Sequence, residues 1–225
     1  MLQGWGFVFS VLSTVRSINP EEIMKATTVL VTLLLVLCLP LCVYAQKESA
    51  NLIKNGDFEK FTGDNPDGWD TSNIPGTLTV VSASKIVKTG AHAVKCEVKD
   101  FFGSMIAGFV CQKNLPNAGK DLRLSGNFMV HSVGKDQGVV VICFQNAGGS
   151  TIGTVEEYFD DTNSKWTEFS REYKSPAGSA LVHIRLTVLP SKGNEKVHAG
   201  SYVLCDDLKL AAFTPAPPAE KPLIQ

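Results

Sequence analysis

Carboxylates that lie close together in the sequence are the first candidates for chemistry. Glu156-Glu157 and Asp160-Asp161 place four acids within six residues. Glycoside hydrolysis uses two carboxyl groups held about 5–9 Å apart across a cleft. These acids stand in a polar stretch before Trp166, where acidic runs are usually solvated. The histidines show no H-E-x-x-H spacing, and the sequence has no G-x-S-x-G elbow or phosphate loop. We therefore expect no catalytic residues and interpret the protein as a non-enzyme.

Polar side chains also follow one face of two strand-like segments. Arg123 and Asn127 alternate with apolar residues in 121–131, and His183, Arg185 and Thr187 do so in 180–189. Alternation with a period of two places these side chains on the wet face of a sheet. Simple solvation explains any one of them. As a group on neighbouring strands, they indicate a shared face that could bind a ligand.

The elements that must position these residues are short strands. Period-two patterns, broken by Gly, Asn, Asp and Pro, predict an all-β fold with antiparallel pairing, a sandwich or a barrel. Residues 138–146 are apolar on both sides, which predicts a central strand. The expected strands are 51–54, 77–84, 91–98, 105–113, 121–131, 138–146, 167–174, 180–189 and 201–210.

The first 45 residues indicate export. Lys25 precedes the apolar run 29–39, and Pro40 and a cleavage pattern ending at Ala45 follow it. We expect a signal peptide over 24–45, a mis-chosen start for 1–23, one domain over 48–213, and a disordered tail over 214–225, which has four prolines. The expected location is secreted, periplasmic or extracellular. An uncleaved anchor is the alternative.

Charge and cysteine content narrow the partners. The net charge of −1 gives no reason to expect nucleic acid, or a membrane after signal cleavage. The cysteines that follow Ala45 permit disulfides in three pairings. Each lies in an apolar strand pattern, so buried free thiols are an equal alternative. No pair has C-x-x-C spacing, which argues against zinc. These cysteines are Cys96, Cys111, Cys143 and Cys205.

Several short motifs occur in the order found in one family. The domain opens with NLIKNGDFE at 51–59, and Gly68-Trp69 and TGAHAV at 89–94 follow. KWTEF at 165–169, PAGSA at 176–180 and YVLCDDLKL at 202–210 complete the series. In these motifs the chain resembles the carbohydrate-binding modules of families 4 and 9, which are often attached to cellulases and xylanases. The resemblance spans residues 50–212. It implies a galactose-binding-like β-sandwich of jelly-roll type.

The resemblance also implies a structural calcium ion that ties the first strand region to the last. The corresponding positions are Asp57, the backbone of Gly90 and Asp206, with Glu59 or Asp207 as further ligands. Calcium takes about six to eight oxygen ligands, so the fold must bring these segments together.

The resemblance finally implies a non-catalytic sugar-binding role, with a polysaccharide or oligosaccharide as ligand. Comparison strand by strand adds Gln112 and Asn146 to the polar residues of a sheet groove. Sugars are bound by such polar groups and by aromatic rings, for which Phe102 and Tyr158 are the candidates. One alternative is a structural or adhesive envelope protein that binds another protein. The other is a part of a glycoside hydrolase system, with a separately encoded glycoside hydrolase or envelope protein as partner.

Overall fold

The computed structural model describes residues 50–117 and 119–213, and the regular elements of these residues are all β-strands. The predicted signal peptide, upstream extension and tail lie outside the described residues. Within the described ranges, no helix has the length and apolarity needed to cross a membrane. The strands are β1 (Phe61–Thr62), β2 (Asn65–Pro66), β3 (Asp70–Thr71), β4 (Val81–Ser84), β5 (Ala93–Phe101), β6 (Ser104–Ala107), β7 (Phe109–Pro116), β8 (Asp121–His131), β9 (Gln137–Gln145), β10 (Thr151–Phe159), β11 (Thr167–Tyr173), β12 (Leu181–Leu189) and β13 (Tyr202–Phe213).

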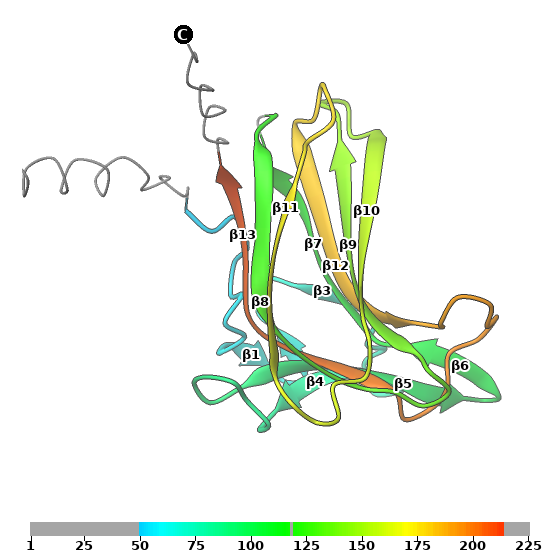
Figure 1. The fold of residues 1–225 in the computed structure, drawn as a ribbon. Helices are drawn as coiled ribbons and strands as arrows, with labels where there is room; N and C mark the ends of the chain where they lie inside the picture. The colour runs from blue at the N-terminus through cyan, green and yellow to red at the C-terminus, as the bar shows by residue number, and fades with distance from the viewer. Residues whose placement is uncertain (1–49, 118, 214–225) are drawn as a thin grey trace, which may run out of the picture. The chain divides into compact units, whose positions relative to one another are not determined.

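Two antiparallel sheets form a sandwich. Sheet I has the order β10-β9-β12-β7-β3, and sheet II has the order β11-β8-β13-β5-β4, with β6 paired to β5. Figure 1 shows β7, β9, β10 and β12 standing together opposite β8, β11 and β13. The central strands of each sheet pair with strands from distant parts of the chain, as in a jelly roll, whereas β9 with β10 and β4 with β5 are consecutive. The predicted all-β sandwich is confirmed.

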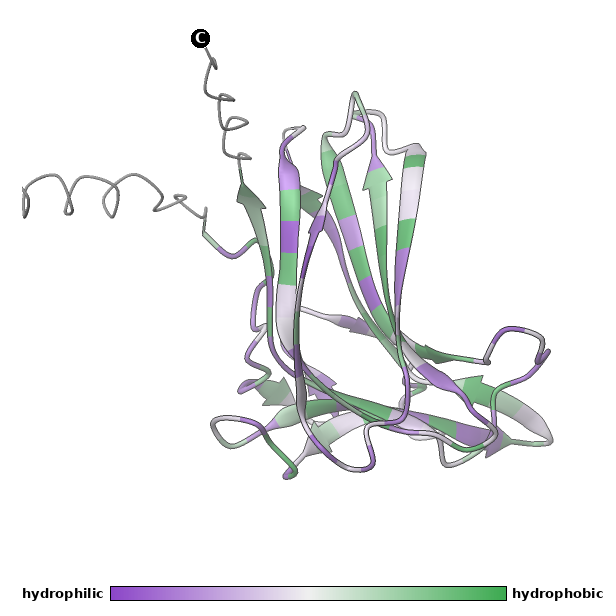
Figure 2. Ribbon diagram, viewed as in Figure 1, coloured by the Kyte–Doolittle hydropathy of each residue, from purple (hydrophilic) through white to green (hydrophobic). Residues whose placement is uncertain are grey.

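Alternating side chains build the core between the sheets. Figure 2 shows apolar and polar bands alternating along β8 and β12. Phe128 of β8 in sheet II is fully buried, and its ring stacks on Phe159 of β10 in sheet I at 4.2 Å between centroids. Phe169 of β11 completes this aromatic cluster, with its centroid 4.7 Å from that of Phe128. Each such ring pair contributes about 0.5–1.5 kcal/mol beyond simple burial, so this cluster fastens the two sheets together.

Four predicted elements differ from the structure. Of the strand expected over 77–84, only Val81–Ser84 (β4) is a strand. The strand expected over 105–113 is divided at Gly108, where the chain leaves β6 beside sheet II and enters β7 of sheet I. Residues 51–54 form bends, although Leu52 N–H donates to the Leu210 carbonyl at 2.7 Å. The stretch 151–159, interpreted as a polar loop, is the edge strand β10. Its inward residues Val155 and Phe159 pack on the core, and their polar neighbours concealed that pattern.

Candidate functional site

A hollow of about 400 Å³ lies on the outer face of sheet I. Strands β7, β9, β10 and β12 supply its walls and floor, so rigid paired backbone positions every lining side chain. The floor is mainly aliphatic and thiol, and the charged groups stand above it. The lining residues are Cys111, Lys113, Val141, Cys143, Glu156, His183, Ile184, Arg185, Thr187 and Leu189.

The strand register explains how charge is spread across this face. One row runs from Glu156 through Val141, Arg185 and Cys111 to Asp70, each residue opposite the next. Adjacent strands lie about 4.8 Å apart, so the backbones of the charged residues in this row are separated by roughly 10 Å. Arg185 therefore occupies the middle of the face, with an acid two strands away on either side.

Within the described part of the chain, the guanidinium of Arg185 contacts an aromatic ring and not a carboxylate. Its guanidinium lies over Phe109, 4.3 Å from the ring centroid, and the side chain is exposed. Lys113 is paired with Asp70 at 2.9 Å. Thr187 is buried, and its hydroxyl donates to the Gly108 carbonyl at 2.9 Å.

His183 occupies the end of the hollow beside β7. Its Nε2 lies 3.4 Å from Asn114 Oδ1. Asn114 has a φ of 58°, at the point where the pairing of β7 with β12 shifts register. Burial, and then the nearby Lys113, lower the pKa of His183. The imidazole is therefore neutral at pH 7 and can both donate and accept a hydrogen bond.

Three of the predicted binding residues meet in this hollow, namely His183, Arg185 and Thr187. The expectation that Arg123 and Asn127 share their face is wrong, because β8 belongs to sheet II. Arg123 forms an ion pair with Glu172 there. Asn127 is 8% exposed and stands opposite Asp206 of β13.

The side chains of Gln112 and Asn146 form hydrogen bonds with backbone groups. Gln112 lies on β7 between the outward Cys111 and Lys113 and is 5% exposed. Its Nε2 donates to the Lys54 carbonyl at 2.6 Å, and its Oε1 accepts from Lys54 N–H at 3.1 Å. Asn146 Oδ1 accepts the N–H groups of Gly148 and Ser150, each at 3.0 Å, in the turn after β9. Neither residue lines the hollow.

The aromatic candidates lie at different places. Trp69 is 7% exposed, packs on Phe58 and donates from Nε1 to the Asn55 carbonyl, as a core residue would. Phe102 is 93% exposed, between β5 and β6. Tyr158 is 46% exposed on β10, and its hydroxyl donates to Glu156, which raises the pKa of Tyr158. Tyr158 therefore stands beside the hollow without lining it.

The four neighbouring acids do not face one another across the hollow. Glu156 lines it, whereas Glu157 is the next residue of the strand and pairs with Arg171 of β11 at 3.3 Å. Asp161 accepts the N–H groups of Ser132 and Asn163 at 2.8 and 2.6 Å. Asp160 accepts from Gln137 Nε2 at 2.7 Å. Three of these carboxylates thus support loops and strand pairing instead of a catalytic pair.

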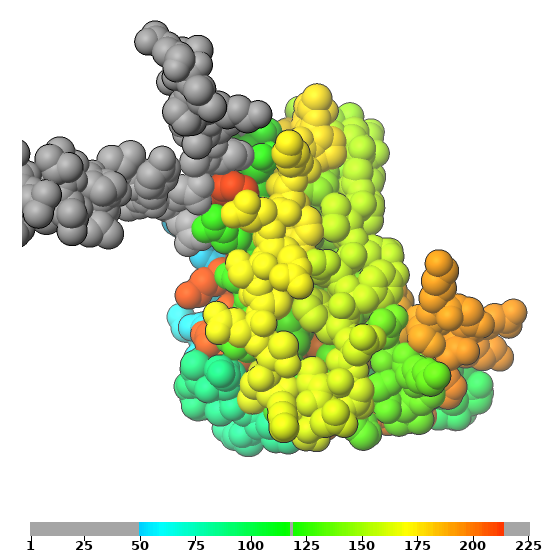
Figure 3. All heavy atoms as spheres, in the orientation of Figure 1, coloured from blue at the N-terminus to red at the C-terminus, as the bar shows by residue number. Residues whose placement is uncertain are grey.

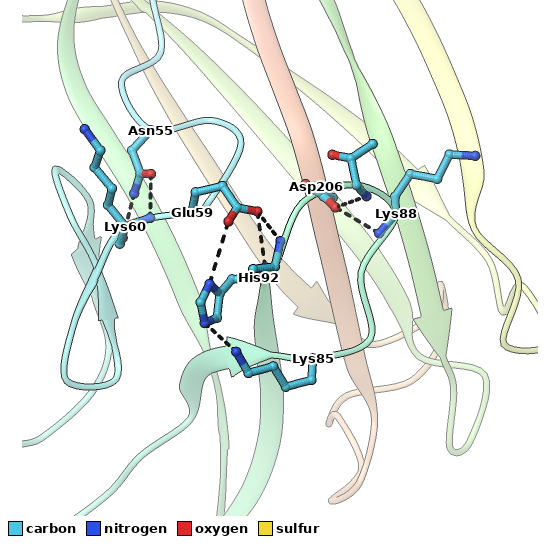
Figure 4. A network of polar contacts seen from close by, with 9 residues as sticks. Asn55, Glu59, Lys60, Lys85, Lys88, His92 and Asp206 are labelled. Carbon is cyan, nitrogen blue, oxygen red and sulfur yellow. Dashed lines mark hydrogen bonds and ion pairs between the residues drawn. The ribbon is translucent and has the colours of Figure 1, made fainter.

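The segments expected around calcium meet at one loop (Figure 4). Buried Asp206 accepts the N–H groups of Lys88 and Thr89 at 2.9 and 3.0 Å through Oδ2. Glu59 accepts the N–H groups of Ala91 and His92 at 2.9 and 3.2 Å, which lowers its pKa. Glu59, near the start of the domain, and Asp206, near its end, therefore both accept hydrogen bonds from the loop over 88–92.

Gly90 lies in the chain between the two residues bound by Asp206, Lys88 and Thr89, and the two residues bound by Glu59, Ala91 and His92. It has a φ of +61°, and a Cβ there would lie 2.1 Å from Glu59 Oε1. Asp57 is exposed, so the early carboxylate that reaches this loop belongs to Glu59. Within residues 50–117 and 119–213, no three His, Cys, Asp or Glu side chains form a cluster suited to a metal. Protein ligands to a cation here would be Glu59, Asp206 and loop carbonyls.

A second hollow of about 560 Å³ adjoins the first and shares Leu189 with it. Met105 of β6 and Val197 of the loop after β12 are among the residues that line it. Figure 3 shows this loop in orange, projecting from the body. Buried Asp136 secures the loop, because it accepts from His198 N–H and from the Ser201 hydroxyl, both at 2.7 Å.

The four cysteines of the domain are free thiols. Cys96 and Cys205 are buried in the core, and burial raises the pKa of Cys96 to about 12. Cys111 and Cys143 lie on the floor of the hollow. The alternative of buried free thiols is therefore confirmed for the core pair.

Comparison with known proteins finds likeness only in structure. No protein-family model matches the sequence, and no curated protein matches it. The enzymatically active domain of bacteriophage CBA120 tailspike protein 4 superposes with a TM-score of 0.52 at 13% identity, covering 73% of this chain and 21% of that one. The chain therefore spans about a fifth of the tailspike chain it matches.

Two carbohydrate-binding modules are also among the similar structures. The CBM22-1 xylan-binding domain of Paenibacillus barcinonensis Xyn10C has a TM-score of 0.49 at 14% identity, covering 77% of this chain and all of that one. TmCBM61, solved with β-1,4-galactotriose, has a TM-score of 0.46 at 19% identity, covering 73% and 99%. At such identities likeness extends to the fold alone. The domain is an antiparallel β-sandwich of jelly-roll type.

Proposed function

We propose that this protein is a non-catalytic glycan-binding module whose ligand lies in the hollow of sheet I. One observation carries the proposal. Side chains that donate and side chains that accept hydrogen bonds stand together over an aliphatic floor, on paired strands that hold them in place. Ligand sites of this kind are concave, mostly apolar, and carry a few fixed polar groups.

Sugar hydroxyls match this set because each can donate and accept. Arg185 and Lys113 offer only donors, Glu156 offers only acceptors, and neutral His183 offers one of each. The aliphatic floor made by Val141 and Leu189 suits the C–H faces of a sugar ring. A sugar of two or three units has a size comparable with the hollow, and the adjoining hollow leaves room for a longer chain.

Glycan arrays and affinity gels with the purified protein test this function. We expect binding that is lost in Arg185→Ala and weakened in His183→Ala. Arg123→Ala is the matched control, because it removes an arginine from the outer face of sheet II and should leave binding unchanged. Retention of a protein from the cell envelope, with binding to no glycan, would replace this proposal with the adhesive alternative. Release of reducing sugar that is lost in Glu156→Gln would establish an enzyme.

The sequence resemblance further leads us to a structural calcium ion at the Lys88–His92 loop. The convergence of Glu59 and Asp206 on that loop supports it, since bound calcium would neutralise two carboxylates held near one segment. Thermal melts with and without a chelator are the test. We expect the chelator to lower the melting temperature. An unchanged melting temperature would mean that hydrogen bonds alone, without calcium, stabilise this loop.

Export is proposed from residues 24–45. Their apolar run and cleavage pattern are those of a signal peptide, and the described domain begins shortly after them. N-terminal sequencing of the protein from its native host should yield Gln46 as the first residue. A first residue upstream of Val29 would mean that the apolar segment is retained.

A further inference from the structure

The charged groups of the hollow are unequally neutralised. Lys113 forms an ion pair with Asp70 at 2.9 Å, whereas Glu156 accepts a hydrogen bond from the neutral Tyr158 hydroxyl and keeps its charge. The backbone of Arg185 lies in the same cross-strand row as Glu156 and Asp70, two strands and therefore roughly 10 Å from the backbone of each acid. Among the described residues, no carboxylate forms an ion pair with Arg185. Its positive charge is therefore the one in this hollow left without a counter-charge.

Packing nevertheless fixes the direction of this guanidinium. It lies over the Phe109 ring at 4.3 Å, on a central strand paired on both sides. A guanidinium stacked in this way presents its N–H groups at the edge, in a planar arrangement that matches the two oxygens of a carboxylate. Because stacking on Phe109 restricts the side chain before the ligand arrives, less conformational entropy is lost on binding than for a freely rotating arginine.

The floor beneath Arg185 also influences which sugar can bind well. Val141, Cys111 and Cys143 form it, and the ring of Tyr158 lies outside the lining. Stacking of a sugar on a broad aromatic surface is therefore not offered inside the hollow. Binding strength must come largely from polar groups, and charge-assisted hydrogen bonds are roughly twice as strong as neutral ones. This floor of one valine and two thiols offers few partners to water below the charge, which strengthens such a bond.

We propose that the hollow selects an acidic oligosaccharide, with the carboxylate of a uronic acid residue bound by both edge N–H groups of Arg185. This inference rests on the glycan-binding function proposed above and specifies its ligand class. Glu156 accepts hydrogen bonds from hydroxyls of the same or the next sugar, and it disfavours a second carboxylate at that place. His183 and Lys113 donate to oxygens at the other end of the hollow.

The test compares ligands that differ only in their acid groups. Oligomers of galacturonic, glucuronic and mannuronic acid are titrated into the purified protein, each beside the same oligomer after reduction of its carboxyl groups to alcohols. At least one acid form should bind about tenfold or more tightly than its reduced form, and added salt should weaken that preference. Equal binding of the acid and reduced forms would overturn the inference while leaving glycan binding intact.

Substitutions at Arg185 test whether this residue causes the preference for the acid form. Arg185→Gln should bind acid and reduced forms alike, and Arg185→Lys should recover only part of the preference because it lacks the planar fork. Arg171→Gln is the control, since it removes an exposed arginine on β11. A preference for the acid form that persists in Arg185→Gln would refute the assignment. The ligand comparison on the unaltered protein does not depend on how the variants fold. If no glycan of either kind is bound, the proposed function fails together with the inference.

Discussion

Replacing Gln112 with alanine should weaken the fold without altering the proposed ligand site. Gln112 is 5% exposed and joins β7 to the backbone of Lys54 through two hydrogen bonds, of 2.6 and 3.1 Å. Each bond contributes about 1 kcal/mol, so Gln112→Ala should lower the free energy of unfolding by about 2 kcal/mol. For a domain of this size that corresponds to a fall in melting temperature of about 4–8 °C.

Calorimetry or urea unfolding measures this loss, and glycan binding is measured well below the melting temperature. The matched control is Gln137→Ala, which removes a glutamine with a single exposed hydrogen bond to Asp160 and should change stability by less than about 0.5 kcal/mol. An unchanged melt for Gln112→Ala would refute the role of this clamp. If Gln112→Ala instead lost glycan binding while its stability was unchanged, Gln112 would be a residue of the sugar site, as the sequence resemblance implied.

Three further predictions concern the Gly90 loop and the thiols. Gly90→Ala should cost about 2 kcal/mol or more in urea unfolding, because its Cβ would collide with Glu59, whereas Gly63→Ala, at a similar φ of +62° with open space around it, should cost less. The pKa of Glu59 lies below its ordinary value of 4.5 in the folded protein, so its stabilisation is present above that pH and is lost as the pH falls through the lowered pKa. The melting temperatures of the protein and of Glu59→Gln should therefore converge in acid, and a constant difference down to pH 3 would contradict this. Mass spectrometry after brief alkylation should find Cys143 labelled and Cys96 and Cys205 protected until unfolding; protection that survives unfolding would indicate a disulfide.

Strand patterns were most informative where one face of a strand is buried. The stretch 121–131 is β8 to the residue, and 180–189 is β12 with one residue fewer at the start. Their inward residues are buried and their outward residues are mostly polar, as period-two alternation predicts, although the outward Asn127, Met129 and Thr187 are buried as well. Local alternation thus revealed which side of each strand is wet.

Alternation does not reveal which sheet a strand joins. Arg123 and Arg185 stand on outward faces of strands that pair with different neighbours, β8 with β11 and β13, and β12 with β7 and β9. Those pairings join residues far apart in the sequence, and no local signal encodes them. Sequence reasoning also missed Glu156 and Lys113 as binding-face residues. The signal for Glu156 was present, since Val155 and Phe159 have the spacing of an inward strand face.

Gly108 joins the two sheets of the sandwich, because the chain passes there from β6 beside sheet II to β7 of sheet I. A side chain at this corner would meet the Val80 carbonyl at 2.2 Å, while the Gly108 N–H donates to Glu97 and its carbonyl accepts from Thr187. One layer therefore cannot slide along the other without breaking bonds to both. Because Thr187 also lines the hollow, this corner ties the hollow to sheet II, and a relative movement of the two sheets would reach the hollow through β12.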